Sequence, residues 1–288
     1  MAGQSNTESS NYWNGDGGKQ WVRFDARFDD QLESFGRAVL DRASLQHDER
    51  VVDIGCGTAA LTIDAARAVG FFGRVAGVDV SKRMLSGAQD KIDHIDGGSA
   101  TSMAPIELIR ADVQTEPLGV AEYDVAVSRF GVMFFEDPEE AFVNVRRAVR
   151  PGGRLVFACW QSPADNLWLS KPRAAVSHLL ELPTVEPELP GPFSMARLDR
   201  TLAMLGRAGW IGASARPVEV DLHIGGLGSV ADAVEFVTHS GPIGVALQDR
   251  KKKRRKKVEA ALTAAFEPHY DGVGVSLPAA AWVVEARR

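Results

Sequence analysis

The sequence predicts an α/β fold, in which a mostly parallel sheet carries helices on both faces. Short apolar runs alternate with amphipathic segments between residues 50 and 160. The first of these runs passes directly into a glycine-rich turn at residues 55–57. Strands that alternate with helices favour a parallel sheet, because each crossover helix packs on a sheet face. The 288 residues are 45% hydrophobic and 25% charged, as is usual for a globular chain.

The N-terminal half contains the clearest elements. Residues 1–17 are polar and rich in glycine, so we expect a flexible tail, whereas apolar residues at three- and four-residue spacing predict helix over residues 18–43. Together, residues 1–44 would form a tail and an N-terminal helical lid. Residues 45–160 would form the core of the fold. Within this core we expect strands at 50–54, 74–78, 106–110, 123–127 and 154–160, and helices at 59–69, 81–91 and 138–149.

The pattern changes after residue 160. Residues 161–195 are rich in proline, with one helical piece expected around residues 174–182. With a helix over 198–208, we interpret residues 161–212 as a cap insertion over the active site. The C-terminal strands and helices of residues 213–288 would complete the sheet. There, strict alternation predicts a half-exposed antiparallel strand at 218–224, followed by helices at 229–239 and 243–267 and a final strand at 279–286.

The charge distribution is uneven. The net charge is −5, but Arg250–Lys257 is a run of eight cations, and without it the balance is 25 − 38 = −13. An acidic body does not suit a nucleic-acid-binding protein. A helical run spreads its charges around the helix axis, and no aromatic residues are interleaved with it for base stacking. We therefore interpret the run as a solvated helix face and expect no nucleic-acid partner.

Other features exclude further classes. No apolar run approaches the roughly 20 residues that span a bilayer, so we expect no membrane partner. The N-terminus resembles neither a signal peptide nor a transit helix, which favours a cytoplasmic protein. The two cysteines, Cys56 and Cys159, lie in apolar segments, and the six histidines are scattered. These patterns exclude a disulfide scaffold and predict no metal site.

The strongest signal for function is the segment VVDIGCGT at residues 51–58. Its glycines, Gly55 and Gly57, allow a sharp turn and let a ligand approach bare N–H groups at a helix N-terminus. Such a turn suits any nucleotide-binding α/β unit, although Ala60 stands where a dinucleotide fingerprint has its last glycine. Asp53 stands two residues before the first glycine.

Two further strands end in acids. Asp79 lies 22 residues after Gly57, where a carboxylate can accept both ribose hydroxyls of an adenosine. Asp112 follows the third strand, where a carboxylate can accept from an adenine amino group while the Val113 N–H donates to a ring nitrogen. Three strand ends thus present acids at the edge where open α/β sheets bind ligands.

Taken as an ordered set, the motifs DIGCGTA, GVDVS, ADV, YDVAVSRFGVMFF and RAVRPGGRLVFACW resemble those of class I S-adenosylmethionine-dependent methyltransferases. The resemblance covers about residues 45–160. The Ser-Arg-Phe-Gly stretch and the Pro-Gly-Gly turn are similar to the subgroup with quinone C-methylases and small-molecule natural-product methyltransferases. It implies a Rossmann-like seven-stranded sheet with an antiparallel last strand. It also implies S-adenosylmethionine as cofactor and S-adenosylhomocysteine as product.

The resemblance also implies roles for individual residues. Asp53, Gly55 and Gly57 would hold the methionine part of the cofactor, Asp79 the ribose, and Asp112 and Val113 the adenine. Met84 would pack on the adenine or ribose, and Ser128 and Arg129 would close the pocket. Cys56, Thr58, Val80 and Ala111 would complete the cofactor-binding set. The chain departs from the family at Ala59, where a third glycine is usual.

We expect the acceptor to be a small molecule, with an amine or a phenol as the first guess, because the cap implies an enclosed pocket. Transfer of a methyl group is an in-line displacement that relies mainly on alignment and exclusion of water. The residues expected to bind the acceptor are Trp13, Trp21, Phe130, Met133 and Trp160, and Tyr12, Phe134 and Trp168 are further aromatic candidates for an acidic pocket that favours a cationic donor.

No catalytic residue is assigned. His178, His223 or His239 could each serve as a general base, and each could equally be an ordinary polar residue. The alternatives are an RNA methyltransferase that uses residues 250–257, an NAD-dependent dehydrogenase, and a module that binds the cofactor without turnover. Against the dehydrogenase, the chain has no YxxxK pair and no GxGxxG. The oligomeric state stays open.

Overall fold

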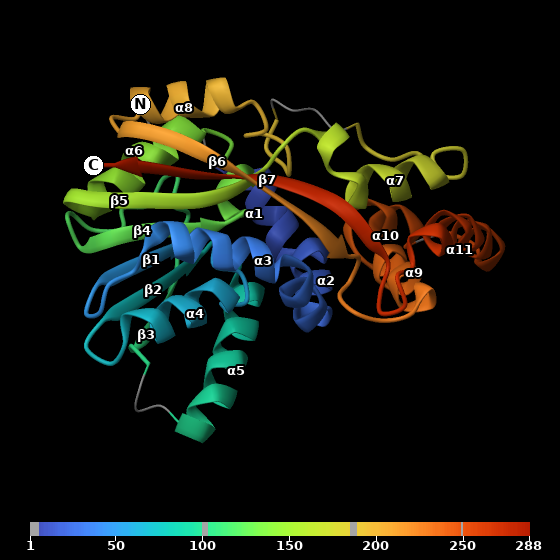
Figure 1. Ribbon diagram of the computed structural model, residues 1–288, viewed down its shortest axis with the longest axis horizontal. Coiled ribbons are helices and arrows are strands. Elements are labelled where there is room, and N and C mark those ends of the chain that lie inside the picture. Colours follow the sequence, from blue (N-terminus) through green and yellow to red (C-terminus); the bar gives the residue numbers. More distant parts are fainter. Residues whose placement is uncertain (1–5, 100–102, 185–188, 249) are drawn as a thin grey trace.

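The computed structural model of the chain describes residues 6–99, 103–184, 189–248 and 250–288. They form a seven-stranded sheet in the order β3-β2-β1-β4-β5-β7-β6 (Figure 1). β7 runs antiparallel to both of its neighbours, and the other neighbouring pairs are parallel. The expected α/β class and reversed last strand are therefore confirmed. The strands are β1 Arg50–Ile54, β2 Arg74–Asp79, β3 Ile106–Arg110, β4 Tyr123–Arg129, β5 Val149–Trp160, β6 Ile211–His223 and β7 Ser276–Arg287.

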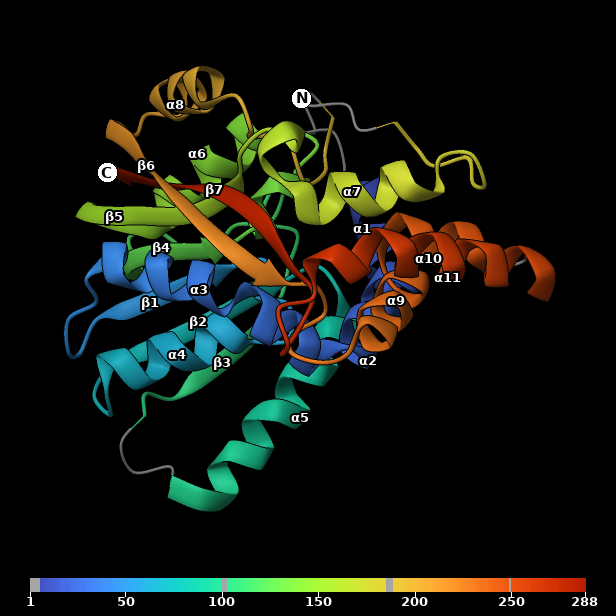
Figure 2. The ribbon, with the colours of Figure 1, turned by 45° about the vertical axis from the view of Figure 1, so that its right-hand side comes forward.

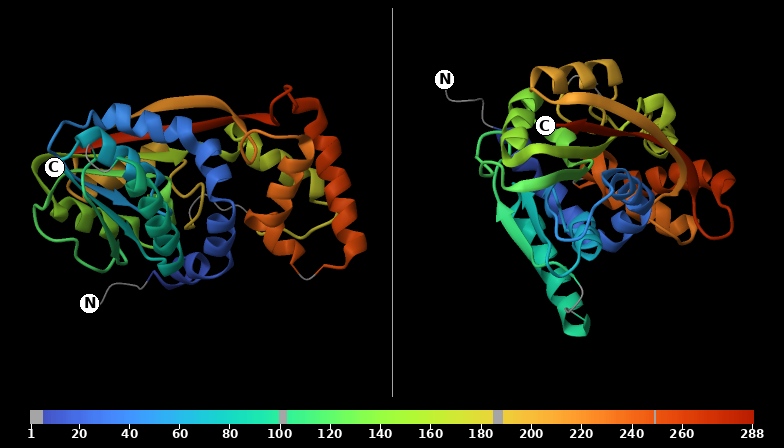
Figure 3. Two further views of the ribbon diagram at one scale, coloured as in Figure 1. Left: turned by 90° about the horizontal axis from the view of Figure 1, so that it is seen from below. Right: turned by 60° about the vertical axis from the view of Figure 1, so that its left-hand side comes forward.

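Helices cover both faces of the sheet. α3 and α4 lie on one face, and α6 and α8 lie on the other (Figures 1 and 3). The interior strand β1 is buried along residues 51–54, which explains the apolar residues Val51, Val52 and Ile54, while Asp53 is a buried acid among them. The helices are α1 Thr7–Asn14, α2 Asp16–Arg23, α3 Asp25–Ala43, α4 Ala60–Val69, α5 Lys82–Ser99, α6 Pro138–Ala148, α7 Leu167–Val176, α8 Leu198–Arg207, α9 Val230–His239, α10 Gly241–Leu247 and α11 Lys252–Phe266.

The N-terminal segment differs from the expectation. Residues 7–14 and 16–23 form α1 and α2, where we expected a flexible tail through residue 17 and helix only from residue 18. Tertiary contacts explain the difference. The Ser81 hydroxyl donates to the carbonyl of Trp13 (2.7 Å), and the Lys82 N–H donates to Oδ1 of Asn14 (3.1 Å). Docking on α5 thus stabilises short helices whose own sequence is too polar to predict them.

The second half also departs in detail. The helix expected around residues 174–182 is α7, which begins seven residues earlier and includes Pro172, and the helix expected over 243–267 is divided into α10 and α11. As expected, helices lie between the last two strands, where residues 224–275 carry α9, α10 and α11 between β6 and β7. In Figure 2 these helices and α7 form a helical lobe at one end of the molecule.

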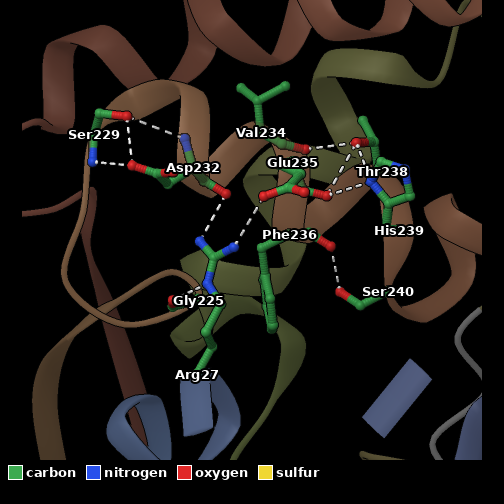
Figure 4. A network of polar contacts seen from close by, with 10 residues as sticks. All are labelled: Arg27, Gly225, Ser229, Asp232, Val234, Glu235, Phe236, Thr238, His239 and Ser240. Carbon is green, nitrogen blue, oxygen red and sulfur yellow. Dashed lines mark hydrogen bonds and ion pairs between the residues drawn. The ribbon is translucent and has the colours of Figure 1, made fainter. Parts of the chain in front are cut away.

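Arg27 of α3 ties this lobe to the sheet-covering helices (Figure 4). Its guanidinium donates to the carbonyls of Gly225 (2.6 Å) and Asp232 (2.7 Å) and lies 3.5 Å from a carboxylate oxygen of Glu235. α9 itself begins with a capping box between Ser229 and Asp232. The lobe is therefore fixed against the N-terminal helices that adjoin the sheet edge. Among the described residues, no helix has the length and apolar character to cross a bilayer.

Candidate functional site

The turn after β1 has the backbone conformation that its glycines favour. Gly55 and Gly57 have φ values of +66° and +57°. A Cβ atom at Gly55 would lie 2.8 Å from the Cα of Gly131, so that no side chain fits there. Ala59, at the position of the family's third glycine, also has a positive φ of +68°. The turn thus forms although alanine is the less favourable residue at this position.

Asp79, at the end of β2, stabilises this turn through hydrogen bonds. Its carboxylate accepts hydrogen bonds from the N–H groups of Gly57 (2.9 Å) and Ser81 (2.8 Å). Burial raises the pKa of Asp79, and these hydrogen bonds act in the opposite direction. Each carboxylate oxygen accepts one hydrogen bond here and has a further lone pair to offer. The arrangement fits the binding of two ribose hydroxyls above the turn.

Asp53 does not contact the glycine amides. Its Oδ2 accepts from the Thr62 hydroxyl (2.7 Å), while Oδ1 is buried and has no hydrogen-bond partner within the described residues. Burial raises the pKa of Asp53 to about 7. A buried acceptor without a donor is costly, and a cationic group placed beside it would remove that cost. The residue therefore fits the ammonium group of the cofactor's methionine part.

The third strand end borders a cavity of about 530 Å³ (Asn6, Thr7, Ser10, Asn11, Val80, Arg110, Ala111, Asp112, Thr115 and Glu116). Asp112 accepts from the N–H of Gln114 (3.1 Å) and the side-chain amide of Asn6 (3.4 Å). Val113 is buried, and its carbonyl accepts from Asn144 (2.8 Å). Ala111 and Asp112, which the family resemblance assigns to the cofactor-binding set, line this cavity.

Several other expected cofactor residues have structural contacts of their own. The Ser128 hydroxyl is buried and donates to the carbonyl of Ile54 (2.7 Å). Met84 is 4% exposed, and its methyl group lies 3.3 Å from the position of a Cβ on Gly57. Burial raises the pKa of the Cys56 thiol, which makes this side chain unreactive. The carbonyl of Val80 accepts from Asn14 (3.4 Å).

A network of charges, which the sequence analysis missed, joins α3 to the rest of the site. Asp29 pairs with Arg129 (3.0 Å) and with Lys91 (2.5 Å), and Asp25 pairs with Lys91 (2.7 Å). The Thr58 hydroxyl donates to Asp25. Asp25 and Asp29 stand four residues apart on α3, a spacing that places both on one helix face. This spacing was the available signal, but nothing in the sequence identified the partners.

The candidate acceptor-binding residues fall into two groups. Phe130, Met133 and Trp160 are buried, and Phe130 stacks on Trp160 with ring centroids 3.9 Å apart. Trp13 and Trp21 instead belong to a half-buried row of aromatic residues at the sheet edge. The ring centroids of Trp13 and Phe134 are 5.0 Å apart, and those of the stacked rings of Trp21 and Phe28 are 4.0 Å apart. We call Trp13, Trp21, Phe28 and Phe134 the aromatic row. Of the two groups, the aromatic row is the more accessible to a ligand.

The three histidines occupy different environments. His178 is exposed, and His223 pairs with Asp271 (2.8 Å). His239 of α9 directs Nδ1 at the carbonyl of Glu235 (2.9 Å), which can only accept a hydrogen bond (Figure 4). Nδ1 also lies 3.3 Å from the hydroxyl of Thr238, so that this nitrogen is engaged by groups of its own helix. The ring of His239 lies 6.4 Å from that of Phe24, which contacts Phe236 beside Phe28 of the aromatic row. No group of three potential metal ligands occurs among the described residues.

Known proteins share parts of this sequence. Residues 52–157 match the model of a methyltransferase domain. The chain is 30% identical over 132 residues to the ubiquinone/menaquinone biosynthesis C-methyltransferase UbiE of Stutzerimonas stutzeri, covering 46% of this chain and 50% of that protein. It is 28% identical over 142 residues to a demethylmenaquinone methyltransferase of Staphylococcus epidermidis, covering 49% of this chain and 55% of that protein. The chain thus spans about half the length of these curated relatives.

Solved structures share the fold at low sequence identity. The YcgJ protein of Bacillus subtilis has a TM-score of 0.58 and 14% identity, over 89% of this chain and 98% of that one. Phosphoethanolamine N-methyltransferase 2 of Haemonchus contortus, solved with S-adenosylhomocysteine, has a TM-score of 0.57 and 14% identity, over 99% of this chain and 60% of that one. These similarities confirm the Rossmann-like architecture.

Proposed function

We propose that this chain, whose residues 52–157 form a class I S-adenosylmethionine-dependent methyltransferase domain, transfers a methyl group to a small hydroxylated aromatic molecule. The cofactor of this class is S-adenosylmethionine. The observation that carries the proposal is the proximity of two features. The Ser81 N–H donates to Asp79 beside the glycine turn, and the Ser81 hydroxyl donates to the backbone carbonyl of Trp13, whose ring belongs to the aromatic row.

Each of three strand ends would bind one part of the cofactor. Asp79 accepts the ribose hydroxyls, the Oδ1 atom of Asp53 receives the ammonium group, and Asp112 borders the adenine cavity. The bound group supplies an electrophilic methyl on a sulfonium. An acidic site below an aromatic surface suits that cation.

The acceptor half is supported by the aromatic row and by the relatives. Flat half-buried rings favour a flat apolar acceptor by stacking and edge contacts. UbiE of Stutzerimonas stutzeri is a C-methyltransferase of ubiquinone/menaquinone biosynthesis, and the Staphylococcus epidermidis relative is a demethylmenaquinone methyltransferase. These two sequence relatives favour a phenolic ring over an amine. A ring hydroxyl makes the ring and its oxygen nucleophilic, so that loss of a proton can accompany methyl transfer.

The residues of this chain contribute mainly alignment and exclusion of water. α1 and α2 lie over the carboxyl end of β2, where Asn14 contacts Val80 and Lys82. The network of Asp25 and Asp29 fixes α3 to α5 and β4. We infer that these contacts hold the aromatic row beside the cofactor-binding edge, where the acceptor would be aligned with the methyl group that the cofactor would supply. The dehydrogenase alternative is not retained, since the matched domain is a methyltransferase domain.

The test is a methyl-transfer assay with isotopically labelled S-adenosylmethionine and two matched panels, hydroquinones and phenols in one, and primary and secondary amines in the other. We expect labelled product from the first panel and, at acceptor concentrations below KM, less of it from the Trp21→Ala variant. Labelled product from amines alone would overturn the acceptor class. Cofactor binding without any transfer, in the presence of both panels, would favour a binding module instead.

A further inference from the structure

The basic run has an organised surface in the folded protein. Residues Lys252–Lys257 form the first turns of α11. The arginines of the run turn back to the protein, since Arg254 donates to the carbonyl of Leu179 and Arg255 to that of Leu247 (3.3 Å). Val258, Leu262 and Phe266 bury the same side of the helix. The charges are therefore not spread evenly around the axis, contrary to the expectation from the sequence.

Four lysines remain on the opposite side. Lys252, Lys253, Lys256 and Lys257 are exposed and fall within an arc of about 140° at about 100° per residue. We call them the lysine face. Within the described part of the chain, no ion pair involves any of these four residues.

The positions of these four lysines at the start of α11 are electrostatically unfavourable. The positive end of a helix dipole lies at its N-terminus, where cations are disfavoured and acids are preferred. α11 has no acidic residue in its first turn and no side-chain cap at Lys251. A sequence selected for folding alone would not place its lysines there. An external anion would offset both the mutual repulsion of the lysines and their conflict with the dipole.

The position of the lysine face favours a planar partner. The N-terminal end of α11 lies at the outer end of the helical lobe, away from the sheet (Figures 1 and 2). The remainder of the chain carries −13, so that a long polyanion running along the body would be repelled. A flat anionic surface that touches only the end of the lobe avoids this repulsion, because charges are screened beyond about 8 Å at physiological ionic strength.

The residue types also favour lipid over nucleic acid. The lysine face offers flexible point charges, while the arginines, which bind phosphates in a bidentate manner, are held by protein carbonyls. No aromatic residue lies within residues 250–257 to stack on a base. We propose that the lysine face docks this protein on the anionic headgroups of a lipid bilayer, as a peripheral contact that needs no membrane-spanning helix. This differs from our expectation, from the sequence, of no membrane partner.

The experiment is co-sedimentation of the full chain with phosphatidylcholine vesicles, with and without phosphatidylserine. The test variant is K252Q/K253Q/K256Q/K257Q. The control variant is R37Q/R67Q/R74Q/R207Q, which removes the same charge from exposed sites elsewhere. We expect binding to the anionic vesicles only, weakened by salt. Because each lysine contributes about fivefold, the test variant should bind at least about 100-fold more weakly while the control stays nearly unchanged.

Two results would overturn the proposal. One is equal vesicle binding by the test and control variants. The other is tighter binding of the wild type to a single-stranded RNA or a DNA duplex than to anionic vesicles at the same ionic strength, with loss in the test variant. The latter would assign the lysine face to a nucleic acid. Affinity for S-adenosylhomocysteine, expected to be unchanged in both variants, reports whether they fold.

Discussion

The carboxylate of Asp79 accepts a hydrogen bond from the N–H of Gly57, 22 residues earlier in the chain, at 2.9 Å. This contact couples the end of β2 to the turn after β1, so that the backbone of the turn and the proposed ribose acceptor are fixed together. The same carboxylate orients Ser81, whose hydroxyl contacts the N-terminal helices. The cofactor-binding edge and its cover are thus one connected unit.

The raised pKa of Asp53 predicts a pH-dependent stability. The carboxyl is fully buried, and its pKa rises from 3.8 to about 7 in the folded state. A folded pKa above the unfolded one means that the folded state binds more protons between these values, so that stability is lost as pH rises through the window from about 4 to 7. Relative to the wild type, Asp53→Asn should gain on the order of 4 kcal/mol in unfolding free energy across this window. Urea denaturation at several pH values measures the difference, and parallel curves for the two proteins would contradict it.

Ligand binding should alter the ionisation of Asp53. If the ammonium group of S-adenosylhomocysteine lies beside Oδ1, binding favours the carboxylate and releases a proton below pH 7. Calorimetry at pH 6 in buffers of different ionisation enthalpy should therefore detect proton release in the wild type and less in Asp53→Asn. The same proton balance in both proteins would remove Asp53 from the proposed ammonium site.

The network around Asp29 should stabilise the fold. Asp29 is 24% exposed and forms ion pairs with both Lys91 and Arg129. The Asp29→Ala substitution therefore leaves two partly buried cations with fewer partners. We expect a loss of roughly 1–2 kcal/mol in unfolding free energy, between the values for exposed and buried pairs. Asp41→Ala, an exposed change on the same helix, is the control. Equal stability of the two variants would show that the network contributes nothing.

The two aromatic groups should respond differently to truncation. Trp160 is 3% exposed and packs on Phe130 and Phe35, so Trp160→Ala should cost about 3–5 kcal/mol in unfolding free energy. Trp21→Ala, in the aromatic row, should reduce methyl transfer mainly through acceptor KM, with a smaller effect on stability. Thermal unfolding and steady-state kinetics separate the two effects. A Trp160→Ala protein that is stable but has lost acceptor binding would reverse the assignment.

His239 is the candidate general base. Its Nε2 is free of the hydrogen bond that Nδ1 makes to Glu235, and a positioned base contributes about 100- to 10,000-fold. His239→Gln should lower kcat if His239 accepts the proton during methyl transfer. The control is His178→Gln, at an exposed position. If both variants retain the wild-type kcat, alignment alone accounts for the transfer.

The sequence predicted the core of the fold well because periodicity and glycine position are local signals. β1 has the expected bounds, and the acids Asp53, Asp79 and Asp112 end neighbouring strands as proposed. It failed where distant contacts decide local structure. α1 exists through contacts with Ser81 and Lys82, and the helix expected over 243–267 is divided into α10 and α11. The roles of Asp25 and Asp29 depend on partners between 33 and 100 residues away.

The most direct measurement is calorimetric titration of the purified protein with S-adenosylhomocysteine and, separately, with NAD. Asp79→Asn is the test variant and Asp64→Asn, at an exposed position of α4, is the control. We expect S-adenosylhomocysteine to bind the wild type and the control alike. Loss of a charge-assisted hydrogen bond should weaken binding to Asp79→Asn by about 10- to 100-fold. Unchanged affinity in Asp79→Asn, or binding of NAD instead, would contradict the cofactor site described above.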